Sequence, residues 1–466
     1  MKNENTINPR IEAIFFEQGQ GLNWFDIQRK ILQQSSNIGN DTVVGYGTSD
    51  VLQASAGDDL LMGLDGGDVY HYEIGSGNDT IFDGSKYPQI FTNLFIGVNW
   101  GADDTLKFGA GIKPSDITYQ RLSKADDLTI KIAGQSDFIT VKDHFDATKL
   151  DLFNLLGITW FDRIEKFEFA DGTVQTWENV LRIITKGDNA NNSIYGAMTN
   201  DTIIGYKGND LLAGEDGNDI YIDNLGDGND TINDMRENIL VPSNDILRFE
   251  TGIGFDNTIF TRENGVIRNG ILIGGDNLVV SFNNSSDKIV IKDFYKIIET
   301  GPFGTQEFNL IERFEWADGT SRSWVEISRD IIARAKTTGN DTIFGTHFDD
   351  TISGGLGDDF LVGTNGSDIY QFNRGDGNDT VYDLLDNILS GNNDVILFGA
   401  NINPNDIIIQ RTGGRVGVNE LQGLEDLRLN IRGSNDTLIV RDQFQYSTIN
   451  VRFNEIENIR FADGTN

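Results

Sequence analysis

Residues 339–383 read GNDTIFGTHFDDTISGGLGDDFLVGTNGSDIYQFNRGDGNDTVYD, and this stretch repeats every nine residues. Its aspartates Asp341, Asp350, Asp359 and Asp368 stand nine apart, and an apolar or aromatic residue follows each after two positions. A period of nine matches neither a helix nor an ordinary strand. It fits a tight turn followed by a very short strand, stacked repeatedly into a solenoid. The apolar residues then face inward, and glycines supply the positive φ of the sharp turns.

The same register occurs twice more in the chain. The first copy carries it at Asp41, Asp50, Asp59 and Asp68, and the second at Asp201, Asp210 and Asp219. Asn192 occupies the first position of the second copy, so we expect a weaker turn there. Each copy then ends after a longer spacing of eleven, at Asp79, Asp230 and Asp379. A tyrosine recurs where a large residue would fill the narrow core, at Tyr70, Tyr221 and Tyr370.

Stacked repeats bring these carboxylates into rows, and carboxylates in a row can bind a cation together. Like charges repel strongly wherever water is partly excluded. A hard cation that takes about six to eight oxygen ligands removes the repulsion by binding carboxylates together with turn carbonyls, as Ca²⁺ does. A single glycine- and aspartate-rich turn is usually only a solvated loop. Four turns in fixed register, found three times, favour metal binding.

The composition narrows the class of protein. The 466 residues carry a net charge of −35, which argues against binding to nucleic acid or to an anionic membrane surface. There is no cysteine, so disulfides and thiolate metal sites are excluded. The first ten residues lack the apolar segment of a secretory signal, and no run of residues is apolar and long enough for a membrane span.

A longer repeat surrounds the nine-residue one. Residues 11–24, IEAIFFEQGQGLNW, align without gaps with 164–177 and 311–324, and a partial copy fills 456–465. Between the aspartate rows lie segments of alternating strand pattern, such as DDLTIKIAGQSDFITVKDHF. The recurring ADGT predicts a type I′ hairpin, and the Ser323–Glu326 spacing predicts a capped short helix. The array begins and ends within a unit, so we expect it to be part of a longer protein.

The segment GGLGDDFLV at 354–362 is a full match to the G-G-x-G-x-D-x-U-x nonapeptide, and the chain resembles the RTX (repeats-in-toxin) family of secreted calcium-binding proteins. The segments between the rows resemble its companion, the haemolysin-type calcium-binding protein related domain. The resemblance implies a right-handed parallel β-roll in which two nonapeptides make one coil. The predicted fold is therefore mostly β, with three short calcium-bound β-rolls alternating with β-rich capping domains that each end in a short helix.

The resemblance also implies the calcium ligands, because the loops stacked on one side of a roll are separated by two nonapeptides. The expected pairs that share an ion are Asp41 with Asp59, Asp50 with Asp68, Asp201 with Asp219, Asp341 with Asp359, and Asp350 with Asp368. We also assign Asp79, Asp210, Asp230 and Asp379 to the metal sites. Backbone carbonyls are expected near Gly57, Gly66, Gly208, Gly217, Gly357 and Gly366. Because the rolls are short and some turns lack the leading glycines, we expect about two or three calcium ions per roll.

The expected domain order follows from these repeats. We predict a tail of a preceding unit at 1–38, β-rolls at 39–83, 187–234 and 339–383, and capping domains at 84–186, 235–338 and 384–466, the last one truncated.

Two functions then compete. The first is a calcium-triggered folding and spacer region of a larger secreted protein, exported by a type I secretion system as the family implies. The second is an extracellular, adhesin-like module whose capping domains recognise a glycan or protein partner. An enzyme ranks third, because the three histidines are not repeated between units and no known catalytic motif is present. We therefore predict no catalytic residues, no organic cofactor and no nucleic-acid partner.

Overall fold

The computed structural model describes residues 13–15, 21–64, 66–83, 103–121, 126–145, 163–234, 243–263, 266–268, 271–273, 275–283, 285–299, 305–307, 310–383, 393–412, 415–416, 421–422, 425–444 and 456–465. Residues 1–12, the start of the predicted tail, lie outside this set. The chain divides into two compact units, the first of Met1–Tyr206, Leu212–Asp219 and Leu240–Ser243, and the second of Lys207–Leu211, Ile220–Ile239 and Asn244–Asn466.

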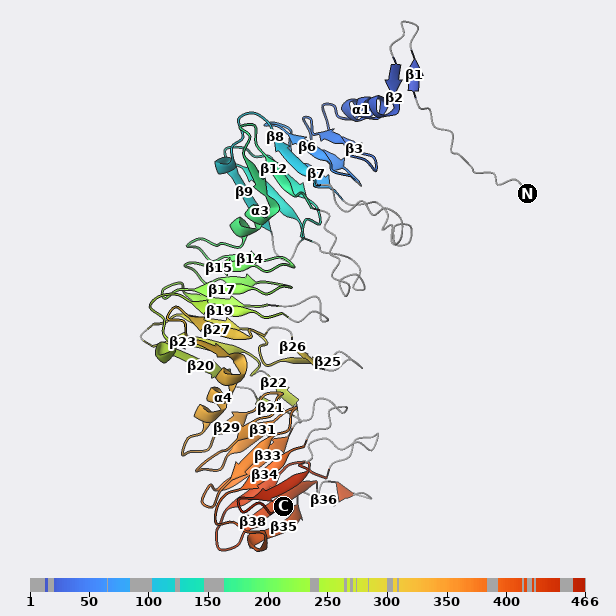
Figure 1. Cartoon of the computed structure of the whole chain (residues 1–466). Coiled ribbons are helices and arrows are strands. Elements are labelled where there is room, and N and C mark those ends of the chain that lie inside the picture. The colour runs from blue at the N-terminus through green and yellow to red at the C-terminus, as the bar shows by residue number, and fades with distance from the viewer. Residues whose placement is uncertain are drawn as a thin grey trace, which may run out of the picture. The chain divides into compact units, whose positions relative to one another are not determined.

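In the first unit the nine-residue segments form short parallel strands that alternate between two sheets (Figure 1). One sheet holds β3 (Thr42–Val44), β5 (Leu60–Met62) and β7 (Asp79–Phe82), and the other holds β4 (Val51–Gln53) and β6 (Val69–Tyr72). Thr42 pairs with Leu60, and Val51 with Val69, so each strand pairs with the one that follows two nonapeptides later. Two nonapeptides therefore make one coil, which confirms the predicted parallel β-roll.

Both sheets of the roll continue into the strands that follow it. β8 (Thr105–Phe108) pairs in parallel with β6, and β12 (Lys166–Glu168) pairs in parallel with β8. In the other sheet β11 (Phe138–Val141) pairs in parallel with β7, and β10 (Leu128–Ile132) and β9 (Ile117–Arg121) complete it in antiparallel order. A single 3₁₀ turn, η1 (Pro114–Asp116), precedes β9. The first roll and the strands beyond it are thus layers of the same two sheets.

One hydrophobic core fills the space between these sheets. In the first roll, the inward residues predicted from the nine-residue register are at most 1% exposed; they are Val43, Leu52, Leu61 and Tyr70. The cluster continues through Leu106, Ile130 and Phe167 of the later strands to Val180 of helix α3 (Trp177–Ile184). The roll therefore does not have a core of its own that is separate from that of the strands that cap it.

The helices begin where the sequence predicts them, directly after a hairpin. They are α1 (Trp24–Ser35), α3 (Trp177–Ile184) and α4 (Trp324–Ala335). The Ser323 side chain accepts a hydrogen bond from the Glu326 N–H, and the Glu326 carboxylate accepts one from the Ser323 N–H, which is the predicted capping box. The preceding hairpins join β1 (Ala13–Phe15) with β2 (Gly21–Asn23), β12 with β13 (Val174–Thr176), and β27 (Arg313–Trp316) with β28 (Ser321–Ser323).

The predicted type I′ turn at ADGT is wrong. A type I′ turn needs a positive φ at both central residues, whereas in this loop only Gly172 has one, at 85°. The Phe169 N–H donates to the Thr173 carbonyl oxygen, so the loop encloses three residues instead of two. A three-residue loop built on a type I turn needs only the final glycine in the left-handed region. Asp171 instead accepts a hydrogen bond from the Thr173 N–H.

The second roll starts with β14 (Ser193–Tyr195), β15 (Thr202–Ile204) and β16 (Leu211–Ala213). In the second unit β17 (Ile220–Asp223) pairs with β19 (Ile246–Phe249), and β19 with β27; β18 (Asn229–Ile232) pairs with β24 (Lys288–Ile291), all in parallel. β23 (Leu278–Phe282) and β20 (Thr258–Arg262) follow in antiparallel order after η2 (Phe255–Asn257). Two short hairpins are formed by β21 (Val266–Arg268) with β22 (Ile271–Ile273) and by β25 (Ile297–Glu299) with β26 (Thr305–Glu307).

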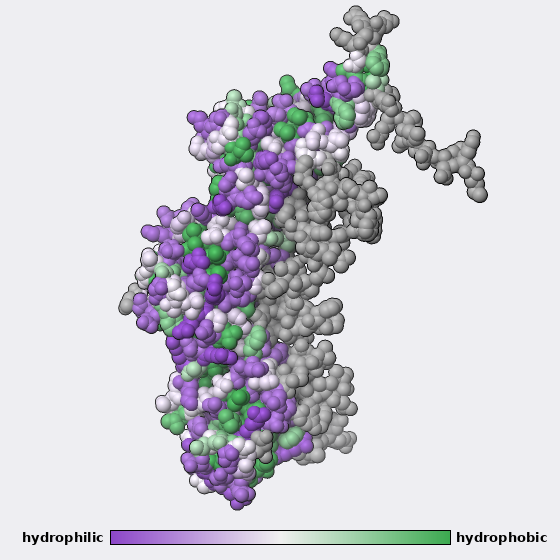
Figure 2. Space-filling model, viewed as in Figure 1, coloured by the Kyte–Doolittle hydropathy of each residue, from purple (hydrophilic) through white to green (hydrophobic). Residues whose placement is uncertain are grey.

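The third roll and its cap repeat the same order. One sheet contains β29 (Thr342–Phe344), β31 (Phe360–Gly363), β33 (Asn378–Asp383), β39 (Thr437–Val440), β38 (Asp426–Ile431) and β35 (Ile407–Thr412). The other contains β30 (Thr351–Ile352), β32 (Ile369–Phe372), β34 (Val395–Phe398) and β40 (Asn458–Phe461). A 3₁₀ turn η4 (Pro404–Asp406) and the short pair β36 (Arg415–Val416) and β37 (Leu421–Gln422) complete it. On the visible face, hydrophilic residues predominate and hydrophobic ones are scattered (Figure 2).

Candidate metal centre

The turns of successive coils lie directly on one another, and glycine makes this close stacking possible. Gly357 has a φ of 131°, and a Cβ there would collide with the backbone carbonyl of Gly339, one coil below. A Cβ at Gly366 would likewise collide with the backbone of Phe348, on the other side of the roll. The predicted ligand glycines Gly57, Gly66, Gly208 and Gly217 also have positive φ values. The sequence register therefore places a column of turns on each side of the roll.

Each predicted pair of aspartates is brought together by a hydrogen bond between coils. The N–H of one aspartate donates to an Oδ1 atom of its partner in the next coil. The N–O distances are 2.8 Å for Asp41 to Asp59, 2.7 Å for Asp50 to Asp68, 2.8 Å for Asp201 to Asp219, 2.7 Å for Asp341 to Asp359 and 2.9 Å for Asp350 to Asp368. The last turn of each roll makes the same hydrogen bond. The N–O distances are 3.0 Å for Asp59 to Asp79, 2.9 Å for Asp210 to Asp230 and 3.0 Å for Asp359 to Asp379. All the predicted aspartates are therefore members of stacked carboxylate columns.

The second carboxylate oxygens differ from turn to turn. Asp350 Oδ2 accepts from the Thr346 N–H at 2.5 Å, within its own turn. By contrast, the Oδ2 atoms of Asp359, Asp368 and Asp379 accept no hydrogen bond from any described residue, although these side chains are at most 2% exposed. A buried carboxylate oxygen without a donor is costly and calls for a cation or a proton. A donor set of oxygens alone, with neither imidazole nor thiolate, fits calcium.

The pKa values of these carboxyl groups reflect the same cost of burying carboxylates without a cation. Burial first, and then repulsion from neighbouring aspartates such as Asp59 and Asp359, raises the pKa of Asp79 and of Asp379 to about 7. Burial likewise raises the pKa of Asp368 to about 9, with added repulsion from Asp383, Asp350 and Asp394. Desolvation and like charges both disfavour the ionised form. A bound divalent ion would reverse this balance.

The structure adds ligand-type residues that the sequence reasoning missed. The carboxylate column continues past the third roll, because the Asp368 N–H donates to Asp394 Oδ1 at 2.7 Å and the Asp394 N–H donates to Glu457 Oε2 at 2.6 Å. The first roll has the same continuation through Asp104 and Glu165. A signal existed in the sequence, since DDTLKF at 103–108 repeats the Asp-Thr-apolar order of the turns.

A second, exposed ladder lies one position before the aspartate column. Asn340 Oδ1 accepts a hydrogen bond from the Asp358 N–H at 3.0 Å, and Asp358 Oδ1 accepts one from the Asn378 N–H at 2.9 Å. Asn40 and Asp58 form the same contact in the first roll. These side chains tie neighbouring turns together through backbone N–H groups. The repeated Asn-Asp and Asp-Asp pairs of the sequence are its signal.

The three tyrosines predicted to fill the roll core are buried, with Tyr70, Tyr221 and Tyr370 at most 1% exposed. Each also donates its hydroxyl hydrogen to an aspartate of the following strand or turn, at 2.6 Å for Tyr221 and Asp234. The equivalent partners are Asp83 for Tyr70 and Asp383 for Tyr370. The hydrogen bond could not be read from the nine-residue register.

The histidines occupy unrelated environments. His144 is 1% exposed beside β12, and burial, together with Arg163 and Arg121, lowers its pKa to about 3. His347 stacks on Trp324 with ring centroids 6.1 Å apart. Burial lowers the pKa of His71.

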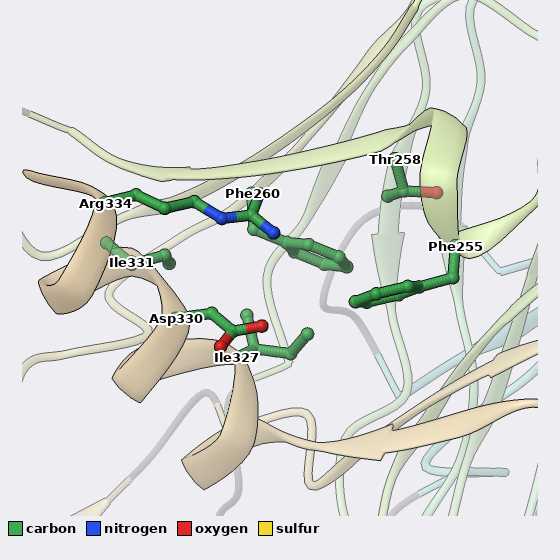
Figure 3. A pocket seen from close by; sticks show the side chains of 7 residues that line it. All are labelled: Phe255, Thr258, Phe260, Ile327, Asp330, Ile331 and Arg334. Atoms are coloured by element: carbon green, nitrogen blue, oxygen red, sulfur yellow. The ribbon is translucent and has the colours of Figure 1, made fainter.

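The small cavity in Figure 3 lies against helix α4 in the second unit. Its volume is about 10 Å³, which is close to that of one water-sized probe. Its lining residues are Phe255, Thr258, Phe260, Ile327, Asp330, Ile331 and Arg334 (Figure 3). A space of this size is a packing gap and not a substrate site.

Among the described residues, none of the helices has the length and apolar character needed to cross a membrane.

Comparisons with known proteins assign both repeat types. Residues 35–70, 186–221 and 337–370 match the RTX calcium-binding nonapeptide repeat (4 copies). Residues 127–178, 277–321 and 426–466 match the haemolysin-type calcium binding protein related domain. No curated protein matches the chain. The crystal structure of extracellular lipase LipA from Serratia marcescens is similar over 55% of this chain and 38% of the lipase chain, with 13% identity and a TM-score of 0.21. The matches to the two repeat types alternate three times along the sequence and show that this chain belongs to the RTX family of haemolysin-type calcium-binding proteins.

Proposed function

We propose that this chain is the calcium-triggered folding and spacer region of a larger secreted RTX protein. One observation carries the proposal: buried carboxylate oxygens of Asp359 and Asp379 have no hydrogen-bond donor among the described residues. In the absence of an ion the fold must bury these charges or protonate them. Calcium ligation by the aspartate columns and the turn carbonyls removes that cost. Binding free energy then becomes folding free energy.

The proposed trigger is the calcium difference across the cell envelope. Extracellular calcium modules bind with dissociation constants of roughly 10⁻⁴–10⁻³ M. At the much lower calcium level of a bacterial cytosol, the anionic rolls would stay expanded and suited to export by a type I secretion system. After export the rolls would bind about two or three ions each and fold. We also propose the domain order predicted from the sequence, with its seven segments and their boundaries.

An adhesin-like binding role is the second candidate, and the tryptophans that begin helices α1, α3 and α4 provide a test of it. A binding surface would keep an exposed aromatic set in every unit. Instead Trp324 is 9% exposed, and the ring of Trp177 lies under the Arg163 guanidinium at 3.9 Å. These residues help to dock helices. The packing therefore favours the spacer role.

The first prediction concerns coupled folding. Far-UV circular dichroism of the full chain should change from a largely unfolded to a β-rich spectrum as calcium is added to the chelated protein. Asp359→Asn should raise the calcium concentration at the midpoint, because it removes one charge from a buried column. The matched control is Asp330→Asn at an exposed position of α4, which should leave the midpoint unchanged. A spectrum that chelator does not alter would sink the proposal.

A further inference from the structure

Each roll ends where a glycine position of the repeat becomes an aspartate. In the third roll the register runs through Gly345 and Gly363 to Asp383, and in the first roll through Gly45 and Gly63 to Asp83. This position faces the narrow interior of the coil. A Cβ at Gly363 would collide with Tyr370, Asp368 and Asp383 side-chain oxygens, and one at Gly63 would collide with the equivalent atoms. The two glycines therefore leave room for polar groups inside the coil.

Three carboxylates converge on this interior space. One oxygen from each of Asp368, Asp383 and Asp394 lies within 4.8 Å of the other two, and the three residues are 0%, 1% and 2% exposed. They come from separate places in the chain: the turn before β32, the end of β33 and the residue before β34. The first roll repeats the cluster with Asp68, Asp83 and Asp104.

A second observation indicates that this cluster takes a ligand. Asp368 Oδ2 points into the cluster and accepts no hydrogen bond from any described residue, although Asp368 is fully buried. The Tyr370 hydroxyl donates to Asp383 Oδ1 and so fixes that carboxylate in place. No lysine or arginine forms an ion pair with these three aspartates in the described part of the chain. Three buried carboxylates without a cation would repel one another strongly.

We propose that the first and the third roll are each closed by a buried divalent cation held by this carboxylate triad, in addition to the sites between the turns. Oxygen-only ligands and three negative charges select a hard ion, with calcium as the extracellular candidate. The site shares Asp368 and Asp394 with the carboxylate column, so it rests on the proposed function in that respect. Asp383 lies at the end of the roll, and Asp394 lies directly before the first cap strand. The ion therefore fastens the cap to the roll.

The competing explanation is a shared proton between Asp383 and Asp394. The Asp383→Asn variant distinguishes a bound cation from a shared proton, because asparagine has the shape of a protonated aspartic acid but carries no charge. The experiment is equilibrium dialysis of the full chain against saturating calcium, followed by elemental analysis of bound calcium. A triad site predicts that Asp383→Asn lowers the count by one ion per chain and lowers the thermal midpoint in calcium. The control Asp330→Asn should leave both unchanged.

The outcomes separate this inference from the proposed function. An unchanged ion count in Asp383→Asn, with a more stable chelated protein, would identify a shared proton and overturn the triad site. Asp359→Asn tests the turn sites independently: a loss of ions there with no loss in Asp383→Asn leaves the proposed function standing alone. A loss in Asp383→Asn without one in Asp359→Asn leaves the triad standing alone.

A second variant keeps the test open if Asp383→Asn does not fold. Tyr370→Phe keeps all three carboxylates and nearly the same volume, and it should retain the ion count. Terbium is a luminescent substitute for calcium, and tyrosines close to the ion sensitise its emission. Loss of the Tyr370 phenol beside the triad should reduce the tyrosine-sensitised emission of bound terbium. Unchanged emission would show that no ion lies next to Tyr370 and would overturn the inference.

Discussion

An aspartate that follows an earlier coil can use its two carboxylate oxygens for different purposes. Oδ1 accepts the backbone N–H of the coil before it, as in Asp341 to Asp359 at 2.7 Å. Oδ2 either closes its own turn or remains available, as in Asp359. The first contact sets the register between coils, and the second leaves a negatively charged oxygen for a metal. A single residue type at a fixed spacing therefore serves stacking and, in our proposal, calcium binding.

Close stacking makes some turn glycines irreplaceable. Gly357→Ala should cost at least about 3 kcal/mol, because it combines a positive φ with a collision against the Gly339 carbonyl. Gly375 is the matched control: its φ is 96°, but a Cβ there meets nothing within 4 Å. Gly375→Ala should cost only about 1–2 kcal/mol, the strain of a left-handed alanine. Denaturant unfolding at saturating calcium measures both, and equal losses would contradict the close stacking.

His144 makes the first cap sensitive to acid. Burial first, and then Arg163 and Arg121, lowers its pKa to about 3 in the folded chain, whereas an unfolded histidine titrates near about 6.5. The unfolded chain thus takes up the proton first. The stabilising effect of the neutral side chain is fully present above about pH 6.5 and is lost as the pH falls from there. We expect a loss of about 1.4 kcal/mol per pH unit within this window.

The sister units supply the control for this prediction. The second unit has Phe294 at the position of His144, and Phe294 is 2% exposed. His144→Phe should therefore fold and should remove the histidine's share of the acid sensitivity. The measurement is the thermal midpoint at about pH 7 and about pH 5 in saturating calcium, compared between the two proteins. Identical pH dependence in both would show that His144 does not contribute.

At the scale of elements, the caps are further layers of the rolls. β33 pairs with β31 of the third roll on one side and with β39 of the cap on the other, both in parallel. A buried arginine then links the first cap to the next turn: Arg121 donates to the Gly196 carbonyl oxygen and pairs with Glu215 Oε2 at 3.0 Å. In the second unit Arg262 donates to the Gly345 carbonyl oxygen. The repeats are therefore joined by hydrogen bonds between layers.

This continuity predicts that calcium controls the caps as well as the rolls. Chelation should speed amide hydrogen exchange in β39, which contains none of the proposed ligands, together with exchange in β31 and β33. The physical reason is that β39 loses its parallel neighbour when the roll unfolds. Exchange detected by mass spectrometry at peptide resolution provides the measurement. If β39 keeps its protection while β31 loses it, the cap folds independently of the roll.

At the scale of the whole molecule, the net negative charge opposes folding, and we propose that bound calcium offsets this repulsion. The chain has 72 acidic residues against 37 basic ones, and its net charge is −35. Self-repulsion of this size favours expanded states. Salt only screens it, with a Debye length that falls from about 30 Å at 0.01 M to about 3 Å at 1 M. A bound ion instead neutralises specific buried carboxylates.

Small-angle scattering can distinguish screening from binding. The radius of gyration of the chelated chain should fall moderately as sodium chloride is added, because repulsion is screened. Calcium at the same ionic strength should reduce it much further, since it allows the coils to form. Magnesium serves as a control, because it prefers six ligands in strict octahedral geometry and sheds water reluctantly. Equal compaction by sodium and calcium would refute calcium-specific folding.

The sequence alone determined the roll, its aspartate columns and the helix starts. These features depend on contacts that recur at a fixed separation, so a nine-residue register such as Asp350 to Asp359 specifies both turn and strand. The capping box at Ser323 is equally local, being contained in four residues.

Only the tertiary structure decided how each roll ends. Asp383 stands in a glycine position of the register, and the segment that leads from it to Asp394 is much shorter than the segment from Asp83 to Asp104. No period connects residues at such variable separations. The strand pairing between β32 and β34, and between β6 and β8, brings these carboxylates together. These carboxylates come together only because the strands pair in register across an insertion of variable length. A local sequence pattern does not contain this information.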